Sequence, residues 1–197
     1  DEDFDNDQDG YCAEGAAVTP SCIVCLAGAP ADCNDTYAAI NPEAVDLPDM
    51  VGVDQNCDGI DGDIERAVFV AASGGSDTNA GTMAKPKKTL QSAIESAYKN
   101  PLKDTVIVAT GTYPGSVKLR MGVHLWGGYV ANKGWSVSPT TKSLIAGGPT
   151  AVDGAQLISQ TSLGRFAIQS AKAISAGQNS IGLFVSESPG LSLEALT

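Results

Sequence analysis

The chain has 197 residues, 43% of them hydrophobic, and a formal net charge of −11. This length suits one large domain or two small ones. The negative charge excludes a generic nucleic-acid-binding protein, because phosphate backbones require lysine and arginine. There is no run of about 18 apolar residues, so no membrane span is expected.

Charge is distributed very unevenly along the chain. Residues 1–65 hold 17 of the 23 acids, all five cysteines and no lysine or arginine. Their formal charge is −17, whereas residues 66–197 carry +6. We therefore expect two modules, an Asp/Cys-rich one over 1–65 and a second over 66–197. The sequence has no initiator Met and starts within an acidic repeat, so we expect a fragment or processed piece of a longer protein.

Two segments of the first module, "DNDQDGY" and "DQNCDGI", share the spacing of a calcium-binding loop. Oxygen ligands at alternate positions let the chain curl around one ion, and glycine at position six permits the sharp turn. Position seven supplies a backbone carbonyl. The first loop comprises Asp5, Asp7, Asp9, Gly10 and Tyr11, and the second comprises Asp54, Asn56, Asp58, Gly59 and Ile60.

The loops differ at position twelve, where a calcium loop places a bidentate carboxylate. The second loop has Glu65 there, with Asp61 and Asp63 as alternatives. The first loop has Ala16 and must take its last ligand from elsewhere. The segment "DCNDT" offers Asp32, Asn34 and Asp35 as that source.

Three other interpretations of this module are weaker. A solvated acidic tail does not explain two copies of the spacing with the correct glycine. A zinc site through "CIVC" lacks ligands, because structural zinc takes four Cys or His and the only histidine, His124, lies in the second module. A redox pair of Cys22 and Cys25 lacks a thioredoxin-like βαβ pattern. Hard oxygen ligands in this number favour calcium.

The two calcium-type loops, together with "ADCNDTYAAINPEA" and "DGIDGD", resemble the MopE-type metal-binding motif of secreted and surface-exposed bacterial proteins. That motif is similar to thrombospondin type 3 repeats, in which calcium ions replace a hydrophobic core. The resemblance covers nearly all of residues 1–63 and implies two or more calcium ions. One departure is "VDLPDM", where many members carry a further cysteine.

Five cysteines in an acidic module indicate an oxidising, extracellular or cell-surface setting. The resemblance implies a disulfide between Cys33 and Cys57. A second bridge among Cys12, Cys22 and Cys25 would leave one thiol, which could pair with another chain or a missing segment.

The second module opens with a predicted strand over Ala67–Ala72. Thr89 can cap a helix over Leu90–Tyr98, in which every third or fourth residue is apolar. Beyond it, short apolar groups alternate with turns. "QLI" and "GLF" start about 26 residues apart, and "FAI" and "LSL" about 25, so we expect them to be equivalent strands in a solenoid.

"VFVAASGGSDTNAGTMAKPKKTLQSAIESA" and "VIVATGTYPGSVKLRMGVHLWGGY" resemble the opening of right-handed parallel β-helix proteins of the pectate-lyase-like superfamily. The resemblance covers residues 67–130 well and implies a helix that caps the N-terminal end. The expected fold is therefore mainly β, a capped parallel β-helix preceded by a small irregular module stabilised by calcium and disulfides.

That superfamily contains lyases, hydrolases and adhesins, so fold alone does not decide function. No local pair of carboxylates indicates glycoside hydrolysis. A lone His124 is typical of a structural or surface residue. Trp126, Tyr129 and Trp135 could stack on sugars, although their place in the first coils favours packing.

We therefore expect an extracellular, calcium-binding surface or matrix structural protein rather than an enzyme. Calcium would stabilise the first module and its junction or assembly. Expected partners besides calcium are further copies of the chain, as in a filament, or other surface proteins. The alternative is a polysaccharide lyase or hydrolase, or a carbohydrate-binding adhesin, whose site lies on coils beyond Thr197.

Overall fold

The computed structural model describes residues 5–13, 31–138 and 140–197, which leaves Cys22 and Cys25 outside the described residues. The chain divides into two compact units, Asp1–Asp63 and Ile64–Thr197. The described residues are mainly β, with parallel sheets and one α-helix. Within them, no helix combines the length and the apolar character that crossing a membrane requires.

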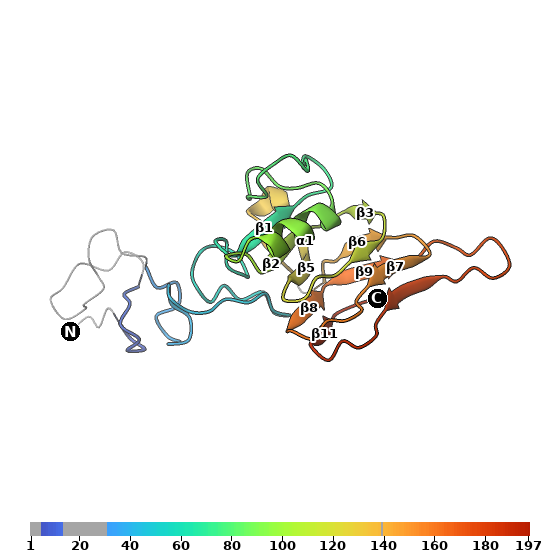
Figure 1. Ribbon diagram of the computed structural model, residues 1–197. Helices are drawn as coiled ribbons and strands as arrows, with labels where there is room; N and C mark the ends of the chain where they lie inside the picture. The colour runs from blue at the N-terminus through green and yellow to red at the C-terminus, as the bar shows by residue number, and fades with distance from the viewer. Residues whose placement is uncertain (1–4, 14–30, 139) are drawn as a thin grey trace. The chain divides into compact units, whose positions relative to one another are not determined.

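Three parallel sheets build the second unit (Figure 1). The five-stranded sheet has the order β1 (Ala67–Val70), β2 (Thr105–Ala109), β5 (His124–Tyr129), β8 (Thr161–Gly164) and β11 (Leu191–Glu194). One three-stranded sheet contains β3 (Thr112–Pro114), β6 (Ser143–Ala146) and β9 (Phe166–Gln169). The other contains β4 (Val117–Lys118), β7 (Thr150–Asp153) and β10 (Ile181–Phe184).

From β2 onward the chain visits the three sheets in a fixed cyclic order. It runs β2, β3, β4, then β5, β6, β7, then β8, β9, β10, and returns to the first sheet with β11. Each strand from β5 onward pairs in parallel with the strand three places before it. Successive circuits of the chain therefore stack on one another.

The strand partners differ from those that the sequence spacing predicts. Leu183 of "GLF" pairs with Val152, 31 residues earlier, and Leu191 of "LSL" pairs with Thr161, 30 residues earlier. The prediction of equivalent strands from a spacing of 25 to 26 residues was therefore wrong. Register in a sheet follows the apolar residues that face the core, and loops of different length between strands obscure it in the sequence.

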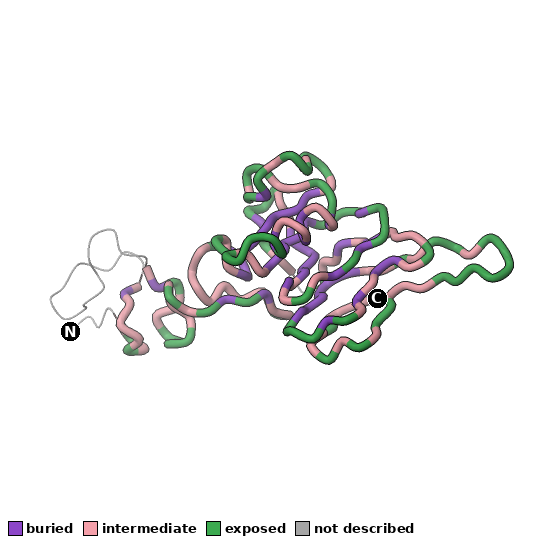
Figure 2. Tube along the Cα trace, viewed as in Figure 1, coloured by how far each residue is buried: buried purple, intermediate pink, exposed green. Residues whose placement is uncertain are grey.

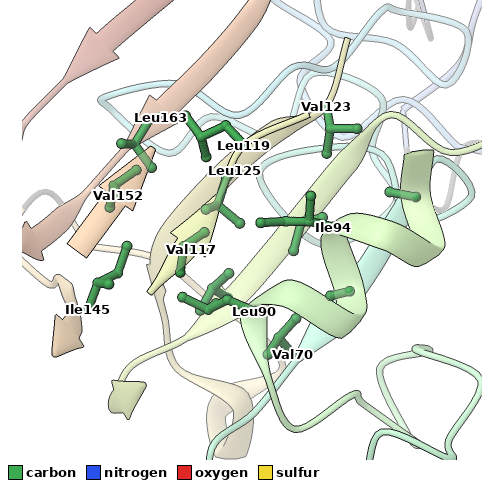
Figure 3. Packing of buried hydrophobic residues seen from close by; sticks show 14 of the residues in the cluster. Val70, Leu90, Ile94, Val117, Leu119, Val123, Leu125, Ile145, Val152 and Leu163 are labelled. Atoms are coloured by element: carbon green, nitrogen blue, oxygen red, sulfur yellow. The ribbon is translucent and has the colours of Figure 1, made fainter. Parts of the chain in front are cut away.

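Helix α1 (Leu90–Lys99) packs against β1, β2 and β4. The hydroxyl of Thr89 accepts from the N–H of Ser92 (3.3 Å), which confirms the predicted cap. The predicted apolar face is also confirmed, because it is buried. Figure 3 shows Leu90 and Ile94 beside the strand residues of the same core. The buried face consists of Leu90, Ala93, Ile94 and Ala97.

The chain after β1 folds back along that strand. Lys87 forms a parallel bridge with Val70, and the Asp77 carboxylate accepts from the N–H groups of Lys88 (3.0 Å) and Thr89 (2.9 Å). The Thr89 hydroxyl donates to the second oxygen of Asp77 (2.9 Å). Asp77 thus orders this turn, and the bridge covers part of the edge of β1.

The two units are stabilised differently. The hydrophobic core cluster consists entirely of residues from the second unit, and Figure 2 shows its buried residues following the strands. The described part of the first unit shows only short buried stretches. Its buried residues are Cys12, Asp32, Asp46, Pro48, Ile60, Asp61 and Gly62. Three of these seven are aspartates, so this unit buries carboxylates where a domain normally buries a core.

Candidate metal centre

The two predicted loops share one hydrogen-bond pattern around the residue at position one. In the first loop, the Asp5 carboxylate accepts from the backbone N–H groups of Asp9 (3.1 Å) and Gly10 (3.1 Å). In the second, the Asp54 carboxylate accepts from the N–H groups of positions five and six, at 3.1 and 2.8 Å. Each loop therefore wraps around its own first carboxylate.

The next ligand positions match as well. The side chain of Asp7 accepts from the N–H of position five (3.2 Å), as Asn56 does in the second loop (3.0 Å). The N–H of Tyr11 donates to the carboxylate of Asp9 at position five (2.8 Å). In the second loop, the N–H of Ile60 donates to Asp58 in the same way (3.2 Å). Four equivalent hydrogen bonds thus hold both loops in the same conformation, with their seventh residues in equivalent places.

Both loops turn at their glycines. Gly10 and Gly59 have φ of +95° and +104°, and a Cβ at either position would meet no atom within 4 Å. Glycine is therefore favoured for its backbone conformation and not for lack of space. Gln8 and Cys57, both at position four, also have positive φ, at 64° and 59°.

Carboxylates converge at the first loop. Oxygens of Asp7, Asp9 and Asp32 all lie within 4.8 Å of one another. Asp32 is 2% exposed, and each of the three residues has one buried carboxylate oxygen without a hydrogen-bond partner. Such bare, converging oxygens fit a hard cation, which uses oxygen ligands alone.

The "DCNDT" segment supplies the extra carboxylates at this loop. Oxygens of Asp5, Asp7 and Asp35 form a second group within 4.8 Å, and the N–H of Asp32 donates to the carbonyl of Cys12 (2.9 Å). Asn34 is placed differently. Its side-chain oxygen accepts from the Thr36 hydroxyl (2.7 Å), and its N–H donates to Asp32 (2.8 Å).

No basic side chain within the first unit can balance these acids. Residues 1–63 carry 16 acids and no lysine, arginine or histidine. Burial raises the pKa of Asp32; the N–H of Asn34 lowers it, and the charges of Asp9 and Asp7 raise it again. Buried carboxylates need a counter-charge or a proton, and a bound divalent cation supplies the former.

The second loop is less complete at its predicted closing residues. The Asn56 amide donates to Asp58 (3.2 Å), and buried Asp61 accepts from the N–H of Asp49 (2.9 Å). Glu65 is exposed and belongs to the second unit, where its carbonyl accepts from the Lys103 ammonium group. Among the described residues, none of Asp61, Asp63 and Glu65 forms a group with the second-loop carboxylates as Asp32 does with Asp7 and Asp9.

Sequence reasoning missed Asp46, in the "VDLPDM" segment. Asp46 is 3% exposed, and its Oδ2 accepts from the N–H of Gln55 (3.3 Å). Burial raises the pKa of Asp46 to about 7; the N–H groups of Gly62 and Gln55 lower it, and the charges of Asp54 and Asp58 raise it. Asp46 lies eight residues before the loop, outside the alternating spacing of the calcium-loop pattern. Its place beside the loop is therefore seen only in the folded structure.

The disulfide joins the two loop regions. Cys33 and Cys57 are bonded, with their Cα atoms 5.6 Å apart, which confirms the pairing that the resemblance implied. Asp32 has a carboxylate oxygen within 4.8 Å of both sulfurs. Cys12 is disulfide-bonded too, and no described cysteine is free. The Cys33–Cys57 bond therefore holds a carboxylate of the first cluster beside position four of the second loop.

In the second unit, the lone histidine takes part in a buried polar contact. His124 Nδ1 lies 2.9 Å from the Ser162 hydroxyl, and Trp126 Nε1 donates to the same hydroxyl (2.8 Å). Burial lowers the pKa of His124; the charge of Asp104 raises it and that of Arg66 lowers it. The ring is therefore largely neutral at pH 7 and serves as a packing and hydrogen-bonding group.

The aromatic residues considered for sugar stacking are buried. Trp126, Tyr129 and Trp135 are 3%, 0% and 4% exposed. Trp135 packs edge-on against Phe69, with ring centroids 4.8 Å apart. Their rings contact the protein interior and present no open face to a carbohydrate, which confirms the packing role.

A groove of about 520 Å³ lies on the second unit beside α1, β4, β7 and β10. Asp153 is the only acid among the described residues that line it, and it accepts from the N–H of Ala155 (3.1 Å). The Gln91 amide oxygen accepts from the N–H of Lys118 (2.8 Å). Glycoside hydrolysis uses two carboxylates, so this lining lacks the required pair.

Comparison with protein-family models, curated proteins and solved structures found no match for this chain.

Proposed function

We propose that residues 1–63 form a calcium-binding module of an extracellular surface or matrix structural protein. One observation carries this proposal. The unit buries aspartates whose bare oxygens converge at a loop with calcium-type spacing, in a segment without any basic residue. Desolvating carboxylates costs several kcal/mol each, so a compact acidic unit requires an external cation.

The first loop would hold calcium through carboxylates from the loop and from the "DCNDT" segment. Its ligands would be Asp5, Asp7, Asp9, Asp32, Asp35 and the Tyr11 carbonyl. The second loop would use Asp54, Asn56, Asp58 and the Ile60 carbonyl. Calcium supplies the positive charge that the module lacks, and ion binding then contributes to folding as a hydrophobic core does elsewhere.

We also propose that the second unit is a right-handed parallel β-helix capped by α1. Support comes from the cyclic visiting of three parallel sheets and from the apolar face of α1 in the core. Right-handed crossovers are the strong general tendency for parallel strands. Such a solenoid suits a structural role, and disulfides in the first unit fit an oxidising location.

Limited proteolysis of the oxidised full chain tests the calcium claim. We expect residues 31–63 to resist cleavage in calcium and to become sensitive after EGTA is added, while residues 64–197 stay resistant in both. Magnesium in place of calcium is the control for a non-specific salt effect. Equal resistance of residues 31–63 with calcium and with EGTA would overturn the proposal.

A further inference from the structure

We propose that Asp46 is the metal ligand that completes the second calcium loop. This inference rests on the proposed calcium-binding function and adds to it a residue that the loop pattern does not contain. Asp46 is 3% exposed, and its Oδ1 is buried without any hydrogen-bond partner. Its Oδ2 accepts from the N–H of Gln55, the residue directly after Asp54 at position one.

Asp32 at the first loop resembles Asp46 in burial and hydrogen bonding, although only Asp32 converges with two carboxylates of its loop. Asp32 comes from outside its loop, is 2% exposed, and has one oxygen fixed by the N–H of Asn34 (2.8 Å). Its other oxygen, Oδ2, is buried and bare. Asp46 likewise has one oxygen that accepts from a backbone N–H and one that is buried without a hydrogen-bond partner. Each loop is thus accompanied by one buried aspartate from the chain outside it.

The charges around Asp46 point to a cation. The negative charges of Asp54 and Asp58 raise the pKa of Asp46, although these three carboxylates do not form a group within 4.8 Å as those at the first loop do, and the first unit contains no base. Carboxylates in a partly desolvated region repel one another, and this repulsion is relieved when a cation binds. A divalent cation converts that repulsion into attraction. Calcium accepts the additional oxygen readily, because its coordination number is about six to eight.

The residue at loop position twelve is a poorer candidate. Glu65 is exposed and belongs to the second compact unit, whereas Asp46 belongs to the same unit as the loop. Asp61 also has one oxygen in a hydrogen bond with a backbone N–H, that of Asp49, but it belongs to the loop itself and is not, like Asp32, an aspartate from outside its loop. Asp46 therefore serves the loop in place of a position-twelve carboxylate.

Two matched substitutions in the oxidised full chain test this assignment. Asp46→Asn keeps the volume and one acceptor oxygen but removes the charge, and Glu65→Gln makes the same change at position twelve. Calcium titration by calorimetry should show one site weakened at least about 10-fold in D46N, because even outer-shell partners typically contribute 10–100-fold. E65Q should bind calcium with the affinity of the unsubstituted chain.

Thermal unfolding distinguishes whether Asp46 acts as a metal ligand or only as a structural hydrogen-bond acceptor. In calcium, D46N should lower the midpoint of the first unit. In EGTA, D46N should leave that midpoint unchanged or raise it, because a repelling charge is gone. An equal lowering in both conditions would show a structural role only and overturn the inference, as would unchanged titration of D46N or a loss confined to E65Q.

Failure of the proposed function gives a different result. If the unsubstituted chain binds no calcium at all, the module proposal fails and the inference fails with it. If the unsubstituted chain binds calcium and D46N binds it identically, only the role of Asp46 is wrong. The titration of the unsubstituted chain therefore distinguishes the two failures.

Discussion

Along the first loop, alternate residues face opposite directions. Asp5, Asp7 and Asp9 are partly buried, whereas Asn6 and Gln8 between them are exposed. Inward-facing oxygens at every second position are what a single ion needs from a short curling segment. This feature is local, so the spacing of the residues was enough to predict it.

Asp7 is the residue where we expect substitution to weaken calcium binding most at the first loop. Its carboxylate belongs to both clusters, with Asp9 and Asp32 and with Asp5 and Asp35. Asp7→Asn should weaken calcium binding at least about 10-fold in a titration, since it removes a shared charge. Asn6→Ala, one position away and exposed, is the control and should bind normally. Comparable losses in both variants would contradict the ligand assignment.

Asp77 should make the second unit sensitive to acid. Loss of some hydration alone would raise its pKa, but the hydrogen bonds from Thr89 and Lys88, together with the charge of Lys87, lower it overall. A lowered carboxyl pKa contributes stability that is complete above the unfolded value of about 3.9 and is lost as pH falls through the folded pKa. Asp77→Asn should remove this acid-dependent loss.

Denaturant unfolding from pH 5 down to pH 2 measures that dependence. Because Asp77 is exposed, we expect Asp77→Ala to cost only about 1 kcal/mol of unfolding free energy at pH 7. Glu187→Gln removes an exposed carboxylate from the same unit and should leave the pH dependence unchanged. If E187Q flattened the curve as much as D77N, the contribution would not be specific to this turn.

At the scale of elements, β1 and α1 are predictable from local signals, whereas the strand partners are not. Helical periodicity and the cap at Thr89 are local signals, and both match the structure. Strand pairing depends on which inward residues meet after loops of unequal length. Leu183 therefore pairs with Val152 on β7 and not with a residue of "QLI", which lies outside any strand.

Tyr113 on β3 links the C-terminal ends of β1 and β2 through hydrogen bonds of its hydroxyl group. Its buried hydroxyl donates to the carbonyl of Ala109 (2.8 Å) and accepts from the N–H of Ala72 (3.2 Å). Burial raises its pKa to about 12 despite the opposing N–H of Ala72, so it stays protonated. Tyr113→Phe should lower the unfolding free energy by about 1–3 kcal/mol, because the N–H of Ala72 loses this acceptor and the carbonyl of Ala109 loses one donor while keeping the Ser143 hydroxyl.

Denaturant unfolding of Tyr98→Phe is the control for that substitution. Tyr98 lies on α1 and is 49% exposed, and its ring lies 5.2 Å from the Arg120 guanidinium carbon. Removing its hydroxyl keeps the ring contact and should change stability by less than about 0.5 kcal/mol. Equal losses for Y113F and Y98F would show that the buried hydroxyl has no special role.

At the scale of the molecule, two kinds of interior lie in one chain. The first unit buries aspartates and is held by disulfides, whereas the core of the second is apolar. The Cys33–Cys57 bond closes a separation of 24 residues, which favours folding by constraining the unfolded chain. Disulfides, together with the calcium ions we propose, would thus take the place of hydrophobic burial in the smaller unit.

These interiors should respond to different perturbations. Leu163 is fully buried in the apolar core, so Leu163→Ala should destabilise the second unit by about 2–5 kcal/mol. Calcium removal should destabilise only the first unit. Scanning calorimetry of the unsubstituted chain and of L163A, each with calcium and with EGTA, should therefore show two independent shifts. L163A should shift the transition of the second unit, and EGTA should shift that of the first. If L163A and EGTA moved the same transition, the two interiors would not be separate.

The sequence by itself determined the features that depend on neighbouring residues. These are the two matched loops, the glycines at their turns, the capped helix and its apolar face. The sequence offered Asp32 as a candidate for the first loop, and the tertiary structure decided that it meets Asp7 and Asp9, that Asp46 lies beside the second loop, and which strands pair in each circuit. Ligand convergence and strand register depend on distances through space, which chain folding sets and sequence spacing does not encode.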